Sequence, residues 1–457
     1  MSLPFKSHLR ASALSFGAVV AIYVPSAARS QVSAAQGGAP PPPTARDAQV
    51  AWLQANAAPI RPANATGSDF ADLAPLGKAI GAARFVLLGE QSDGDGTTIT
   101  AKARIIRYLH EQLGFDVLAF ESGFYDTPRA WAGIVAGDDA VAALRSAVPS
   151  ALGESAEFDP LIDYIAAQRK GARPLEVTGF DSRFTGSATG EHFRQDLGAF
   201  IDRHGIDTAT FDNWAAFSDM LDSLVEREYT LQRPTTAQQQ AFLAVLDAFA
   251  RRIDSIGTGD ADAAYWRQLC RSARVAVGQL FSFEMASRRR GFAGDNARDA
   301  QMADNFAWLE RTRYPGKKIV VWTHTARVVR NTATIDAIRS PRPYNQLVPF
   351  GDLLSKRYGN AVYAIAFVSS QGQTGSVRMT RHRVPPPAPA NLEGLFASTK
   401  LDNAFLDLRG LPASGAWLRA PLTSTAVNGA ALGGDWTKLL DGVVYLRTMA
   451  PATESHR

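Results

Sequence analysis

The sequence predicts an α/β fold in three layers, with a mainly parallel sheet between helices and a helical insertion that caps it. Three observations support this fold class. Several short apolar runs stop at a polar residue near a glycine, which is typical of buried parallel strands that lead into loops. Helical patterns connect the first of these runs, as in βαβ units. Residues 190–313, in contrast, hold helical patterns without a convincing strand.

The N-terminus has the order of a secretory signal peptide over residues 1–30. Lys6 and Arg10 precede the apolar stretch Ala11–Val24, and small residues follow it. A membrane anchor is the alternative, but the stretch is short beside the roughly 20 apolar residues of a spanning helix. We therefore expect a periplasmic or secreted protein without stable membrane insertion after cleavage.

The composition of the remaining chain is that of an ordinary globular protein with a sizeable core. Residues 31–46 predict a Pro/Gly-rich linker, and residues 47–450 predict a single α/β domain that contains the insertion. The formal net charge is only +4, so no nucleic-acid partner is expected. Cys270 is the one cysteine, which excludes internal disulfides and cysteine zinc sites.

The first βα unit defines the start of the sheet. Strand Arg84–Gly89 leads through a glycine-rich loop into helix Thr97–Leu113, which Gly114 ends. The next strand, Asp116–Phe120, is expected to lie beside the first and parallel to it. Before this unit, ordered structure is expected to begin near Ala45–Asn56, and a helix is expected over Asp69–Ile80 with Ser68 as a candidate N-cap. Later strands are expected at Leu175–Asp181, Ile319–His324, Val362–Val368, Ser376–Arg381, Ala404–Leu408 and Val443–Arg447.

Four of these strands end in groups that can do chemistry: Glu90, Glu121, Asp181 and His324. In open α/β sheets, ligands bind in the crevice beyond the carboxyl ends of the strands. A carboxylate at such a strand end lies between the buried core and a partly solvated cleft, where burial and neighbouring charges can shift its pKa. The pattern therefore predicts an active site at this edge.

Five ordered motifs resemble the erythromycin esterase family. Gly89–Gly94 matches G-E-x-x-H-G and is followed by Lys102 and Arg104; Gly114–Gly123 matches G-F-D-V-L-A-F-E-x-G; Gly179–Asp181 matches G-F-D; Arg298, Asp299, Met302 and Asn305 match R-D-x-x-M-x-x-N; and Trp322–Arg327 matches W-x-H-N-x-H. The resemblance implies hydrolysis of an ester or lactone by activated water, without a covalent serine intermediate.

Two motif histidines of the family are replaced. Asp93 stands where the first motif carries its catalytic histidine, and Arg327 stands where the strand-end motif carries its second. In the family the first histidine is the proposed general base, and loss of a general base typically costs about 10² to 10⁴ in rate. The sequence thus leaves two functions open: a hydrolase with impaired or retuned activity, or an inactive relative that binds a macrolide-like or saccharide ligand.

Four residues are the predicted catalytic group: Glu90, Asp93, Glu121 and His324. We expect Asp93 to lie close to Glu90, so that like charges raise one pKa. His324 would then be the base, with Glu90 or Glu121 fixing its tautomer. No cofactor is expected; a transition-metal site built from Asp93, Glu121 and His324 is the less favoured alternative.

Four further residues are predicted to bind the substrate: Lys102, Asp181, Arg298 and Arg327. The cationic side chains Lys102, Arg298 and Arg327 are candidates for stabilising a developing oxyanion. Asp181 and Arg298 have a structural alternative, in which they tie the helical insertion to the sheet.

Overall fold

A computed structural model describes residues 44–457, apart from 65–66, 185, 187, 226–233, 258, 282–290, 337–341 and 379. The predicted signal peptide and the linker up to residue 43 lie outside this part. Helix α1 (Ala45–Asn56) begins inside the predicted linker, because Thr44 and Asp47 form a capping box at its start. Within the described part of the chain, no helix has the length and apolar character needed to cross a membrane.

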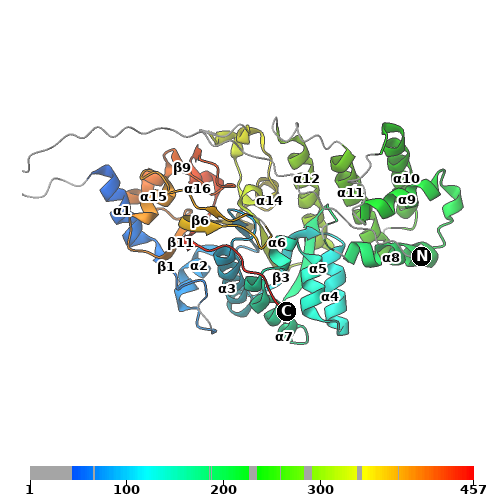
Figure 1. Ribbon diagram of the computed structural model, residues 1–457, viewed down its shortest axis with the longest axis horizontal. Helices are drawn as coiled ribbons and strands as arrows, with labels where there is room; N and C mark the ends of the chain where they lie inside the picture. Colours follow the sequence, from blue (N-terminus) through cyan, green and yellow to red (C-terminus); the bar gives the residue numbers. More distant parts are fainter. Residues whose placement is uncertain are drawn as a thin grey trace, which may run out of the picture. The chain divides into compact units, whose positions relative to one another are not determined.

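The central sheet is mainly parallel, as predicted (Figure 1). Its antiparallel edge is formed by β1 and β8, and all neighbours from β11 to β4 run parallel. In spatial order the strands are β1 (Ala58–Pro59), β8 (Asn403–Asp407), β11 (Gly442–Met449), β6 (Val362–Thr374), β2 (Phe85–Glu90), β5 (Lys318–His324), β3 (Phe115–Gly123) and β4 (Glu176–Asp181).

The prediction that the first two strands are neighbours is wrong, because β5 lies between β2 and β3. Strand β5 is apolar and buried on both faces, so it is suited to a central position with a partner on each side. Its register sets Glu90 opposite His324 and Phe120 opposite Trp322. The insertion of β5 therefore places the histidine between the two glutamate-bearing strands.

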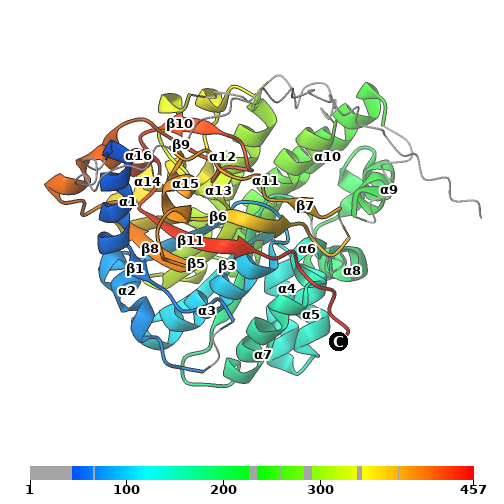
Figure 2. The same ribbon diagram turned by 60° about the vertical axis from the view of Figure 1, so that its left-hand side comes forward.

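Helices cover both faces of the sheet, which gives the three predicted layers. Val86 and Leu88 pack with apolar residues of α2 (Ala74–Ile80), α3 (Gly96–Leu113) and α7 (Asp159–Gln168). Their neighbours Phe85 and Leu87 point the other way, toward α12 (Ala293–Trp308), α14 (Phe350–Tyr358) and α15 (Leu392–Ala397). Figure 2 shows α3 and α7 on one side of β11 and β6, with α14 and α15 on the other.

Every regular element among the described residues of the predicted insertion is a helix. It comprises α8 (Ala188–Arg203), α9 (Trp214–Val225), α10 (Thr236–Asp254), α11 (Ala261–Phe281) and α12, and a π-helical turn follows at Leu309–Arg313. The remaining elements are α4 (Asp126–Ala136), α5 (Ala140–Ala147), α6 (Ser150–Gly153), α13 (Thr325–Val328), α16 (Trp436–Leu439), β7 (His382–Arg383), β9 (Leu422–Ser424) and β10 (Leu432–Gly434).

Two predicted elements differ from the structure. The strand expected at Ser376–Arg381 is absent from its described residues, because β6 continues to Thr374 and the chain turns at Gly375, whose φ is +145°. The helix expected at Asp69–Ile80 starts as a 3₁₀ turn, and its α-helical part begins at Ala74, where a proline occupies the first turn.

Candidate active site

The candidate site lies at the carboxyl ends of β2, β5 and β3. Glu90 ends β2, His324 ends β5 and Glu121 is near the end of β3, while Asp93 lies on the loop between β2 and α3. These four residues, predicted as a group, come together in space. The exposed fraction of the side chain is 59% for Asp93 and 24% for His324, so the site opens to solvent at these two residues.

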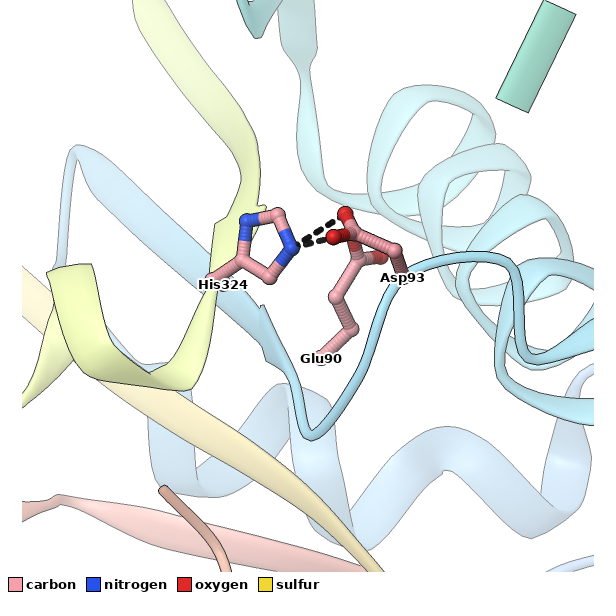
Figure 3. Close-up of side chains that lie close together, drawn as sticks. All are labelled: Glu90, Asp93 and His324. Atoms are coloured by element: carbon pink, nitrogen blue, oxygen red, sulfur yellow. Dashed lines mark hydrogen bonds and ion pairs between the residues drawn. The ribbon is translucent and has the colours of Figure 1, made fainter. Parts of the chain in front are cut away.

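His324 is held on both ring nitrogens by carboxylates. Nδ1 lies 3.1 Å from Glu121 Oε2, and Nε2 lies 2.5 Å from Asp93 Oδ1. Glu90 Oε1 is a third neighbour, 3.7 Å from Nε2 (Figure 3). Because carboxylate oxygens only accept hydrogen bonds, both ring nitrogens must carry hydrogen to satisfy Glu121 and Asp93 together.

The surrounding charges favour the imidazolium form of His324. Burial opposes the positive charge, but the charge of Glu121 and the hydrogen bonds that His324 donates to Asp93 and Glu121 raise the pKa of His324 to about 10. The hydrogen bond to His324 lowers the pKa of Asp93 below its ordinary value, against the effect of burial. The raised pKa of His324 opposes the hypothesis that this histidine is a neutral base. The lowered pKa of Asp93 shows that Asp93 is not the carboxylate whose pKa the pairing with Glu90 was expected to raise, because that hypothesis left out the charged histidine.

Glu121 is the best-satisfied carboxylate of the site. Burial would raise its pKa, but Arg298 at 2.7 Å and His324 hold that pKa well below its ordinary value. Its Oε2 accepts hydrogen bonds from the Thr323 hydroxyl and from the His324 backbone N–H at 3.2 Å. Glu121 is therefore an anion fixed in place behind the histidine.

Arg298, on α12, joins the insertion to the sheet. Its Nε and Nη2 lie 2.9 and 2.5 Å from the two oxygens of Asp181, and Nη2 also contacts Glu121. Although burial disfavours the charged form of Asp181, Arg298 and Arg183 lower its pKa to about 2. Both Asp181 and Arg298 are buried behind Glu121, which agrees with the structural alternative and disagrees with their predicted role in substrate binding.

Lys102 has a comparable place behind Glu90. Its Nζ lies 2.7 Å from Glu90 Oε2 and 3.0 Å from the Thr323 carbonyl oxygen, and its side chain is completely buried. Trp322 Nε1 donates a second hydrogen bond to the same Glu90 oxygen at 3.1 Å. Lys102 therefore orients Glu90 and is too deep to bind substrate as predicted.

Arg327 closes one side of the site. Its Nη1 lies 2.6 Å from Asp299 Oδ2, and its Nε is 3.5 Å from Glu121 Oε1. With 12% of its side chain exposed, against 7% for Arg298 and 0% for Lys102 and Asp181, it is the most accessible of the four residues predicted to bind substrate.

Sequence reasoning missed three supporting residues: Gly89, Trp322 and Thr323. A Cβ atom on Gly89 would lie 2.8 Å from the Thr325 backbone, so only glycine lets β2 pass this close to α13. The W-x-H and G-E motifs contain all three positions, and this was the available signal. Nothing in the pattern, however, said which carboxylate each of them contacts.

Comparisons with known proteins agree with this fold. The family model described as Erythromycin esterase matches residues 110–449. A Bacillus subtilis (strain 168) protein named "Putative hydrolase YbfO" is 27% identical over 442 residues, which are 88% of this chain and 91% of that protein.

Solved structures share the fold at lower identity. A crystal structure from Bacillus cereus has a TM-score of 0.71 at 19% identity and covers 91% of this chain and 100% of the other. The structure of a succinoglycan biosynthesis protein has a TM-score of 0.68 at 19% identity and covers 90% of this chain and 98% of the other. The structure of a mutant of the erythromycin esterase EreC in its open conformation has a TM-score of 0.59 at 17% identity. It covers 86% of this chain and 98% of the other. The chain belongs to the erythromycin esterase family.

Proposed function

We propose that this protein hydrolyses a carboxylic ester or lactone by attack of an activated water molecule. The observation that carries the proposal is the hydrogen-bonded series Glu121–His324–Asp93, which ends in a solvent-exposed carboxylate. Membership of the hydrolytic family supports the reaction class.

In the proposed reaction, a water molecule beside Asp93 attacks the carbonyl carbon. The Asp93 carboxylate accepts a proton from this water, and a tetrahedral intermediate forms. The Nε2 proton of His324 passes to the leaving oxygen as the C–O bond breaks. Transfer of the proton from Asp93 to His324 then restores the starting state, so atoms and charges balance.

The buried residues position this group and stay out of contact with the substrate. Lys102 and Trp322 fix Glu90, while Arg298 and Thr323 fix Glu121. Such preorganisation matters because groups aimed in advance need no reorganisation at the moment of reaction. We expect Asp93 to be a weaker base than a histidine, since its pKa is lowered here.

One observation favours a second function, that of a non-catalytic ligand-binding relative. The 2.5 Å contact of Asp93 with His324 occupies the oxygen that a catalytic base would use. The same solvent-exposed site would then hold a macrolide-like or saccharide ligand without cleaving it.

Purified protein assayed with aryl esters, lactones and macrolides separates these functions. We expect hydrolysis, seen as a mass gain of one water for lactones, and a loss of about 10²-fold or more in Asp93→Asn. Asp402→Asn, which alters an exposed aspartate at another place, is the matched control. Ligand-induced thermal stabilisation without any hydrolysis would favour the binding relative and contradict the hydrolase.

A further inference from the structure

We propose that Glu90, Asp93 and His324 form a binding site for one divalent transition-metal ion, with Zn²⁺ as the best match. One ligand atom from each residue, His324 Nε2 and a carboxylate oxygen of Glu90 and of Asp93, lies within 4.8 Å of the other two. Imidazole nitrogen and carboxylate oxygen are the ligands of three-residue catalytic zinc sites. The inference rests on the proposed hydrolytic function of the same site and deepens it.

The proposed ligand atoms point toward one another. Glu90 uses Oε2 to bind Lys102 and Trp322, so its Oε1 remains directed at the histidine. His324 presents Nε2 to both Glu90 and Asp93 (Figure 3).

The carboxylate behind the histidine also fits a metal centre. Metal-binding histidines usually donate their second ring N–H to a carboxylate, which fixes the ring and raises its basicity. Glu121 holds Nδ1 of His324 in this way at 3.1 Å. Because both its oxygens are already bound by Arg298, Thr323 and His324, Glu121 is a positioning residue. The ligand set therefore differs from the one the sequence suggested, with Glu90 in place of Glu121.

The geometry permits binding with a small movement. Ligands about 2.1 Å from a metal are roughly 3 to 3.5 Å apart. The present separations are 2.5 Å from Nε2 to Asp93 and 3.7 Å from Nε2 to Glu90. Asp93 lies on a loop with most of its side chain exposed, so it can withdraw to make room. The solvent side stays open for a water ligand.

In this form of the enzyme, the ion takes the place of the Nε2 proton, which is released to solvent on binding. Asp93 and His324 then hold the ion and no longer transfer the protons themselves. A metal-bound water would then be the nucleophile, with its pKa lowered toward neutrality. Asp93 as a ligand would explain how a chain without the family's first motif histidine retains hydrolysis.

Metal titration of the chelator-treated full chain tests the site independently of catalysis. Calorimetry with ZnCl₂ should give one site per chain, and Asp93→Ala should weaken it about tenfold or more. Asp93 is an exposed loop residue, so this variant should keep its fold, which circular dichroism verifies; Asp402→Asn should bind like the unchanged protein. Cobalt absorption supplies a spectroscopic check of imidazole ligation, lost in His324→Ala.

The outcomes separate the two proposals. Zinc binding that is unchanged in Asp93→Ala, or no binding at all, would overturn the metal site. Full hydrolysis by metal-free protein would overturn the metal's role and leave the proposed function intact. Zinc bound through these residues without hydrolysis of any ester would support the site and contradict the hydrolase.

Discussion

Replacing Arg298 by methionine tests how much the buried ion pairs of Arg298 with Glu121 and Asp181 stabilise the fold. The guanidinium contacts Glu121 at 2.7 Å and Asp181 at 2.5 Å, where the carboxylate side chains are 9% and 0% exposed. Removing one partner of a buried ion pair leaves an uncompensated charge and costs about 3–5 kcal/mol. We expect Arg298→Met to lose this amount from the free energy of unfolding, measured by urea titration with circular dichroism.

Arg183 provides the matched control, because it contacts the same Asp181 from an exposed position. Its side chain is 46% exposed and its Nε lies 3.1 Å from Asp181 Oδ2. Because the Arg183 side chain is partly solvated and Asp181 keeps its contact with Arg298, Arg183→Met should cost clearly less, about 1 kcal/mol. Equal losses in the two variants would refute the reasoning that burial decides the cost.

Acid should reduce the difference in the free energy of unfolding between Arg298→Met and the unchanged protein. The folded-state pKa of Asp181 is about 2, below its ordinary value of about 4. A carboxylate with a lowered pKa stabilises the fold above pH 4, and that contribution is lost as the pH falls toward 2. A deficit that stays constant from pH 7 to pH 3 would contradict this assignment.

Three other variants or probes test separate parts of the account. In metal-free protein, Glu121→Gln should lower the pKa of His324 from about 10 by more than about one unit, read by NMR of the ring; an unchanged pKa would show that Glu121 does not set it. Gly89→Ala should lower the free energy of unfolding by about 1–3 kcal/mol, because its Cβ would lie 2.8 Å from the Thr325 backbone. Gly198→Ala in α8, where the added Cβ meets open space, should be neutral or stabilising. Similar stabilities of the two variants would be inconsistent with this packing. Burial raises the pKa of the Cys270 thiol to about 12, so a thiol reagent at pH 8 should label it only in denaturant, and rapid labelling of native protein would argue against its burial.

Local patterns predicted the elements that carry the site, and tertiary pairing decided the rest. The helix from Gly96 to Leu113 and its glycine stop follow from periodicity and the left-handed conformation of Gly114, which glycine adopts without strain. Strand ends predicted that Glu90, Glu121 and His324 would meet. The sequence contains no local signal for strand order, so the place of β5 between β2 and β3 was not predicted.

Protonation in the site was mispredicted for a related reason. The pKa of His324 depends on how many carboxylates it meets at once, and Glu121 and Asp93 lie on opposite sides of its ring. Spacing along the chain placed Asp93 near Glu90 but gave no distance to the histidine. Likewise, only the fold shows that Arg298 and Lys102 lie behind the carboxylates, where solvent does not reach them.

Intact-protein mass spectrometry during hydrolysis of an aryl ester in heavy-oxygen water tests the central claim most directly. If water attacks the carbonyl with help from Asp93 and His324, the acid product carries one heavy oxygen, the protein mass stays unchanged throughout turnover, and Asp93→Asn slows the label's incorporation. A protein that gains the mass of the acyl group during turnover, or one that never labels a product, would contradict it.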